Sequence, residues 1–396
     1  MQITDRQQEL TITPIWRLAF RPFFLFGMGF AALAVPLWVL ALNGYLADFT
    51  PASGWLNWHQ HELIFGFAVA IISGFLLTAV QAWTGQPSLS GQPLLSLFAI
   101  WLVARGAWLL NAPLVWLVAL DSLFMLALLL QMSLLLISAK QRRNYPVLLI
   151  LLLLLAANSS FMWGISHDQP ALVQQSSYAG LWLIAAMITL IGGRVIPFFT
   201  QRGLALTQAL PRSAGLDNAL LILTLGLGLL YLSGIAAVLG RYLALIWLLL
   251  AVGHGYRLAR WYRSAIWRVP LLWSLQLAYG WLVIACGLFA LWQVGWMASP
   301  SSAVHAFTVG AMSNMILAMV ARVSLGHTGR PLQLGRLTLV SLVLFNLAVI
   351  ARVLVIHWDY AIGLWLASAL WLLALGLWFI QYLPILTRAR VDGHPG

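Results

Sequence analysis

The chain contains a single cysteine, Cys286, among its 396 residues, and only 8% of its residues are charged. One thiol excludes a disulfide framework, a thiolate metal cage and a Cys-x-x-Cys-His attachment motif. The sequence also has only nine acidic residues and no Walker-type phosphate loop, which argues against an ATPase. Any metal group must therefore be held by histidine, methionine or carboxylate side chains.

Apolar residues make up 62% of the chain and include 21 tryptophans, more apolar surface than a soluble core can absorb. Twelve apolar segments have the length that a helix needs to cross a bilayer. We therefore predict an all-α, polytopic membrane helix bundle that forms a single integral membrane domain over residues 1–396. The predicted spans are 22–43, 59–83, 94–110, 113–138, 146–166, 177–199, 218–239, 241–260, 270–293, 301–324, 335–356 and 360–386.

The formal net charge of +12 is distributed unevenly among the connections between these spans. The connections at 44–58, 167–176 and 294–300 contain no lysine or arginine, whereas those at 139–145, 200–217, 261–269 and 325–334 and both ends of the chain carry basic residues. By the positive-inside rule, both termini are predicted to be cytoplasmic. The basic residues thus indicate a lipid bilayer as partner, and we expect no nucleic acid.

Several of the eight histidines lie within or at the ends of the predicted spans, where an imidazole is costly unless it is hydrogen-bonded or ligates a metal. The densest group is Trp58-His59-Gln60-His61-Glu62. On a regular helix, His59 and His61 point about 200° apart and serve different sites. Glu62 is then placed to orient an imidazole or to ligate copper. The alternative is that these histidines are interfacial residues bonded to loops.

The tenth predicted span combines a histidine with methionines at helical spacing. His305 begins this face, and Met312, Met315 and Met319 follow it. Thioether and imidazole together suit Cu(I), although methionine also fills gaps in apolar cores. The predicted topology puts His305 at the same membrane depth as the histidines of the second span, as a shared metal or haem site would require.

Three further residues are predicted near the cytoplasmic side. His254 lies in the inner half of the eighth span, Arg194 near the inner end of the sixth, and His327 just beyond the tenth. They are candidates for a second haem or an anion site. The run Gly326-His327-Thr328-Gly329-Arg330-Pro331 equally fits a tight turn whose glycines supply positive φ and whose arginine meets lipid phosphate.

Two charged residues lie within apolar spans and need partners. Arg105 precedes the short connection at 111–112 and Asp121 follows it, so an antiparallel helix pair brings both to similar depth. We expect them to neutralise each other as a structural ion pair. A proton relay or a clamp for a haem propionate is the alternative role.

The motifs of this chain resemble those of the NnrS family. The similar segments are Trp58 to Phe67 with Gly74 to Gly85, Gly193 to Thr200, His305 to Ala311, and Arg322 to Pro331. The resemblance implies a twelve-span bacterial inner-membrane protein that contains haem and copper and acts in the response to nitric oxide. The positions that it supports are His59, His61, Glu62, Arg194, His254, His305 and His327. One departure is Gln276, which stands where relatives commonly have a histidine and which cannot ligate haem.

On this basis we expect haem b and copper near the periplasmic side, with Glu62 as a carboxylate that handles protons. The predicted metal ligands are His59, His61, His305 and Met315. Nitric oxide is the expected ligand, and its turnover would require an electron donor that the sequence does not identify. The sequence leaves open whether nitric oxide is turned over or only bound. The main alternative is a twelve-span secondary transporter without metal.

Overall fold

The computed structural model describes residues 9–394, and these residues are helical with no strand. Twelve helical runs among them are long and apolar enough to cross a membrane, which confirms the predicted all-α, multi-pass membrane fold. The helices that form these runs are α2 (Phe20–Leu42), α3 (Gly54–His61), η2 (Glu62–Ala68), α4 (Val69–Thr84), α5 (Gly91–Leu109), α6 (Leu114–Ser138), η3 (Arg142–Asn144), α7 (Tyr145–Ser166), α8 (Pro170–Gly203), α9 (Ala214–Leu232), α10 (Ile235–Leu239), η4 (Gly240–Tyr242), α11 (Leu243–Trp261), α12 (Pro270–Gln293), α13 (Ser301–His305), η6 (Ala306–Ser313), α14 (Asn314–His327), α15 (Arg336–Val353), η7 (Val355–His357) and α16 (Tyr360–Thr387).

The described residues form two compact units. Unit 1 comprises residues 9–180, Arg322–Leu332 and 375–394, and unit 2 comprises Leu181–Ala321 and Gln333–Ala374. Each unit is described by itself below. The single membrane domain over residues 1–396 stays a prediction.

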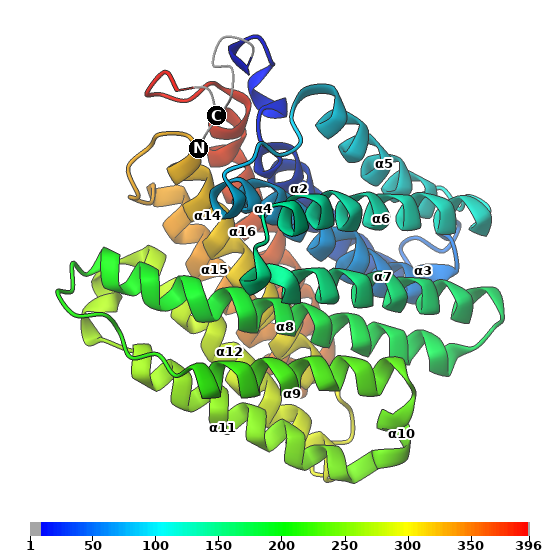
Figure 1. Cartoon of the computed structure of the whole chain (residues 1–396). Coiled ribbons are helices and arrows are strands. Elements are labelled where there is room, and N and C mark those ends of the chain that lie inside the picture. Colours follow the sequence, from blue (N-terminus) through cyan, green and yellow to red (C-terminus); the bar gives the residue numbers. More distant parts are fainter. Residues whose placement is uncertain (1–8, 395–396) are drawn as a thin grey trace. The chain divides into compact units, whose positions relative to one another are not determined.

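Unit 1 is built around α4, which packs on α2 and α6, while α5 and α7 pack on α6 (Figure 1). Small residues let these helices approach closely. A Cβ added at Gly74 of α4 would lie 2.9 Å from Cβ of Phe23 on α2. Because apolar side chains gain little by leaving lipid, such close backbone packing is a main source of association between membrane helices.

Unit 2 is built around α11 and α12, which lie side by side, with α9 against α11 and η6 against α12 (Figure 1). Its core contains an aromatic cluster of Trp182, Trp247 and Phe289. The ring centroids of Trp182 and Trp247 are 4.3 Å apart, and those of Trp247 and Phe289 are 4.8 Å apart. These offset aromatic contacts fix α8, α11 and α12 against one another within the unit.

Several predicted boundaries differ from the structure, by up to seven residues. The second span begins at Gly54 instead of residue 59, and the sixth begins at Pro170 instead of residue 177. The added turns of the sixth span include the polar residues Gln174, Gln175 and Ser176, and proline is favoured at the first position of a helix. The seventh span ends at Leu232 instead of residue 239, because Gly234 has a φ of +77° and breaks the helix.

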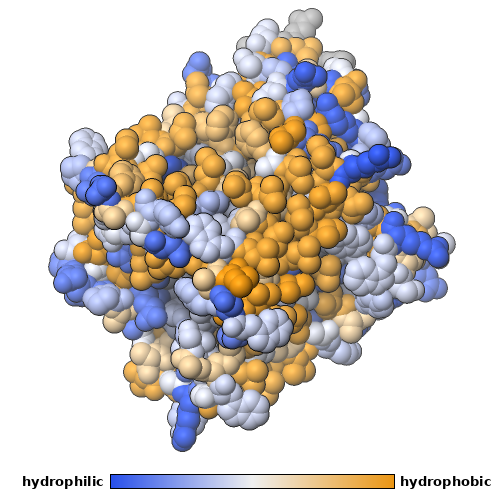
Figure 2. Space-filling model, turned by 180° about the vertical axis from the view of Figure 1, so that it is seen from behind, coloured by the Kyte–Doolittle hydropathy of each residue, from blue (hydrophilic) through white to orange (hydrophobic). Residues whose placement is uncertain are grey.

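Large apolar side chains lie on the surface of both units. Leu134 of unit 1 is 68% exposed and Val238 of unit 2 is 85% exposed. Figure 2 shows apolar residues over much of the face that it displays. Such a surface is stable in contact with lipid tails and would be an aggregation hazard in water.

Candidate functional site

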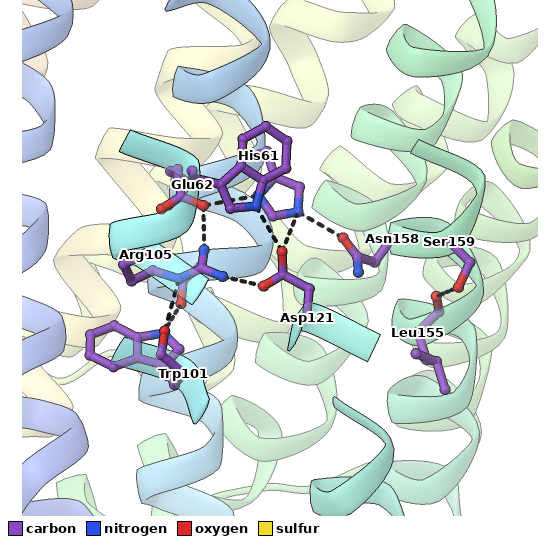
Figure 3. Close-up of polar contacts among 10 residues, drawn as sticks. His61, Glu62, Trp101, Arg105, Asp121, Leu155, Asn158 and Ser159 are labelled. Carbon is purple, nitrogen blue, oxygen red and sulfur yellow. Dashed lines mark hydrogen bonds and ion pairs between the residues drawn. The ribbon is translucent and has the colours of Figure 1, made fainter. Parts of the chain in front are cut away.

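A buried charge cluster occupies the middle of unit 1 (Figure 3). It consists of His61 at the end of α3, Glu62 at the start of η2, Arg105 on α5 and Asp121 on α6. His61 Nδ1 lies 3.0 Å from Oε1 of Glu62, and its Nε2 lies 2.8 Å from Oδ1 of Asn158 on α7 and 3.6 Å from Oδ2 of Asp121. Arg105 pairs with both carboxylates. The predicted ion pair between Arg105 and Asp121 is therefore confirmed, and Glu62 extends it.

The local backbone explains how the cluster is assembled. Directly after His61 the helix changes from α to the π-helix η2. Short π-helical segments within α-helices are frequent at functional sites. Within η2, the guanidinium of Arg105 lies so close to Gly66 that a Cβ there would overlap it. Trp101 Nε1 donates a 2.9 Å hydrogen bond to the carbonyl of Gly66. Glycine at this position therefore lets α5 deliver the arginine to Glu62.

Aromatic rings seal the cluster. The ring of Trp108 stacks on the imidazole of His61 with centroids 4.1 Å apart, and its Nε1 donates a 2.8 Å hydrogen bond to Oδ2 of Asp121. Phe65 and Phe161 pack on the same imidazole at 5.4 and 5.3 Å. His61 is completely buried beneath these rings.

The charges of the cluster do not balance when the imidazole is neutral. Glu62 and Asp121 contribute two negative charges and Arg105 one positive charge, so that the sum is −1. One proton on His61 or on a carboxylate makes the cluster neutral, the favoured condition where a net charge is poorly solvated. Among the described residues, Oε2 of Glu62 is buried without a hydrogen-bond partner. The arrangement can therefore hold one mobile proton.

His59, on the same helix as His61, has a different aromatic partner. Its ring stacks on Trp38 of α2, with centroids 5.0 Å apart and an interplanar angle of 14°. The carboxylate of Glu62 contacts His61 and Arg105.

In unit 2, the candidate with the clearest ligand geometry is His254 on α11. Its Nδ1 lies 2.6 Å from the hydroxyl of Tyr279 on α12, and its Nε2 is buried without a hydrogen-bond partner among residues 9–394. The neighbouring Arg257 donates to the carbonyl of Thr189 at 2.7 Å and pairs with Asp217 at 3.4 Å. Sequence analysis did not identify Tyr279, although its aromatic hydroxyl in an apolar span was a signal.

His305 ends α13, immediately before the second π-helix, η6. Its Nδ1 lies 2.7 Å from the carbonyl of Ser301. Met315 is buried in the same unit. In the same unit, Nε2 of His357 lies 2.8 Å from Oγ of Ser302.

The three cytoplasmic-side candidates do not all fall in one unit. His327 belongs to unit 1, where its ring lies 5.5 Å from that of Phe20. His254 and Arg194 belong to unit 2, and the carbonyl of Arg194 accepts a 2.9 Å hydrogen bond from Arg212. The predicted turn after His327 is present, although only the second of its glycines, Gly329, has a positive φ, of +73°.

The comparison with known protein families agrees with the motifs and the fold. The family model described as NnrS protein matches residues 14–390, nearly the whole chain. The chain belongs to the NnrS family. Among proteins of curated function, none matches this chain.

The NnrS assignment raises the question of which residues fit a haem or a copper ion. Within the described residues, no three histidine, cysteine, aspartate or glutamate side chains are grouped as a metal site. A metal-ligating histidine usually has its other ring nitrogen held by a carbonyl, carboxylate or water. His305 fits this pattern through the carbonyl of Ser301, and in His254 the hydroxyl of Tyr279 takes that place at Nδ1.

His61 fits a ligand role less well in this NnrS protein, because both of its ring nitrogens contact protein oxygen atoms. Ligation by His61 would require its Nε2 to leave Asn158. His59 and His61 belong to unit 1, whereas His305 and Met315 belong to unit 2. A single prosthetic group shared by these four residues stays a prediction. Gln276 donates to Oγ1 of Thr200 at 3.2 Å, so this departure from the family has a structural partner.

Proposed function

We propose that this chain is a bacterial inner-membrane protein that binds haem b and copper and acts in the response to nitric oxide. Its membership of the NnrS family and its twelve candidate spans support this function. The proposal rests mainly on the environment of His254. Its Nε2 is buried without a hydrogen-bond partner among the described residues, while its Nδ1 contacts the hydroxyl of Tyr279. A buried imidazole nitrogen in this state is costly unless it meets a metal or a proton donor.

His254 and His305 would hold haem or copper through Nε2. Met315 would contribute a thioether to copper held by His305 in unit 2, and His59 would be a separate copper ligand in unit 1. When bound, haem would supply the iron that binds nitric oxide. The chain's own residues orient the imidazoles and exclude water from them. Because nitric oxide is small, uncharged and soluble in lipid, the site needs no charged entrance.

The buried charge cluster would supply the proton that any turnover of nitric oxide consumes. Glu62 is the residue proposed to pass this proton, since one of its carboxylate oxygens is buried without a hydrogen-bond partner among the described residues. Arg105 and Asp121 would hold that carboxylate in place. Electrons for turnover would come from a separate donor. If the protein only binds nitric oxide, neither an electron donor nor a proton is needed.

The orientation proposed for the chain has both termini in the cytoplasm. It rests on the absence of lysine and arginine from the connections at 44–58, 167–176 and 294–300. Labelling of single cysteines introduced at residue 48 and at residue 212, in a chain with Cys286 replaced by alanine, tests it. An impermeant reagent should label the first from the periplasm and leave the second unlabelled.

The metal proposal is tested by purifying the full chain in detergent and recording its absorption spectrum and metal content. A haem Soret band that is lost in His254→Ala, and copper that is lost in His305→Ala, would support the two assignments. His167→Ala is the matched control, because His167 is an exposed histidine after α7. A folded protein without colour or metal would contradict the proposal, and substrate-driven uptake into vesicles would then favour a secondary transporter.

A further inference from the structure

Three segments that are distant in sequence meet at one end of unit 1: the start of α2, the turn after α14 and the segment after α16. Nη1 of Arg21 donates to the carbonyls of Leu386 and Arg388 at 2.9 and 2.8 Å. Nη1 of Arg390 donates to the carbonyl of His327 at 3.0 Å. The segments are therefore held together by arginine side chains.

This end of unit 1 has a large excess of positive charge. Five guanidinium groups act electrostatically on one another, and we call them the arginine cluster: Arg17, Arg21, Arg330, Arg388 and Arg390. Only two described carboxylates offset this positive charge. Asp392 pairs with Arg390 at 2.5 Å, and Glu9 interacts electrostatically with Arg17. Burial raises the pKa of the Glu9 carboxyl, which reduces the negative charge that Glu9 contributes against the arginines. Five positive and two negative charges leave an excess of three.

Arg21 is the most buried member of the arginine cluster, with no exposed surface. Its Nε and Nη2 have no hydrogen-bond partner among the described residues. Buried guanidinium donors without an acceptor are costly, and their planar fork matches the oxygens of a phosphate group. Arg330 and Arg390 are only partly buried, so an anion can approach them from the surface above Arg21.

We propose that the arginine cluster binds a phosphate oxyanion, which Arg330 and Arg390 contact from the surface and which Arg21 neutralises from below. The cluster lies where the first, tenth and twelfth candidate spans begin or end, at Phe20, His327 and Thr387. Phospholipid headgroups are found at that depth of a bilayer. The phosphate belongs either to an anionic phospholipid or to free inorganic phosphate. This site is independent of haem, copper and nitric oxide.

The test uses the full chain in two experimental arms. In one, inorganic phosphate is titrated into the detergent-purified protein and binding is measured by calorimetry. In the other, the protein is placed in phosphatidylcholine nanodiscs with or without phosphatidylglycerol, and native mass spectrometry counts the phosphatidylglycerol that stays bound. The variants are Arg21→Gln and Arg330→Gln. Arg263→Gln is the matched control, because Arg263 is an exposed arginine in a basic connection outside the cluster.

Loss of one charge-assisted hydrogen bond should weaken binding on the order of tenfold in Arg330→Gln, while Arg263→Gln binds like the parent protein. If Arg21→Gln fails to fold, Arg330→Gln still decides the matter, since its side chain is partly exposed. Binding in the first arm identifies free phosphate, and binding in the second arm alone identifies the lipid headgroup. No binding in either arm, or equal binding by Arg330→Gln and Arg263→Gln, overturns the proposal.

Discussion

Removal of the Arg105 side chain charge should destabilise the protein more than removal of either carboxylate that it pairs with. Arg105 is the positive charge between Glu62 and Asp121, and all three side chains are almost completely buried. Arg105→Met would leave two buried carboxylates facing each other, with a sum of charges of −2. Removing one member of a buried ion pair typically costs about 3–5 kcal/mol.

The same count predicts a milder effect for Asp121→Asn. Arg105 then pairs with Glu62 alone and the cluster is neutral, although hydrogen bonds from Arg105 and Trp108 are weakened. We expect a loss of about 1–3 kcal/mol in the free energy of unfolding. The double variant Arg105→Met/Asp121→Asn has a sum of −1, so it should be more stable than Arg105→Met alone by about 1–2 kcal/mol.

The measurement is the free energy of unfolding of the four proteins in mixed detergent micelles, followed by tryptophan fluorescence. Arg263→Met is the control for the general loss of a positive charge, because Arg263 is exposed. If Arg105→Met unfolds like Arg263→Met, or if the two substitutions are additive, the charge count that underlies the cluster is refuted.

Two further substitutions test the packing around the candidate residues. Gly66→Ala should lower the free energy of unfolding by about 1–3 kcal/mol, because the added Cβ overlaps Arg105. Gly106→Ala is the control and should be tolerated, because a Cβ there meets nothing within 4 Å. Equal melting temperatures of the two variants would contradict the close approach of Arg105 to Gly66. Tyr279→Phe removes the hydroxyl beside His254 and should keep the haem but shift its absorption maximum and reduction potential; unchanged values would show that this hydroxyl does not position the imidazole.

Much of the fold follows from hydropathy alone, because length and apolar character determine which segments can span a bilayer. All twelve predicted spans correspond to helical runs in the structure. The errors lie at the ends of helices, where polar residues continue a helix beyond its apolar part. Residues 174–176 are helical for this reason, and Gly234 ends a helix within a run that hydropathy had joined.

The candidate site was predicted only in part. Pairing of Arg105 with Asp121 follows from depth, because a short connection makes the two helices antiparallel. The partners of Glu62 and His61 could not be predicted. Assigning residues to one face of a helix assumes 3.6 residues per turn, whereas η2, which begins at Glu62, is a π-helix. Asn158 was visible as a polar residue in an apolar run, but nothing in the sequence indicates that α7 brings it to His61.

The composition of the cluster argues that its role exceeds structural neutralisation. A guanidinium in hydrocarbon needs one carboxylate to balance its charge, and Asp121 alone would satisfy Arg105. The chain has only nine acidic residues, yet it places a second one, Glu62, on the same arginine and adds an imidazole between the two carboxylates. The surplus negative charge is stable in this environment only with a proton bound nearby. A second carboxylate that served packing alone would be replaceable by glutamine without loss, so Glu62→Gln should then retain full function; we expect instead that it keeps the metal content and impairs turnover.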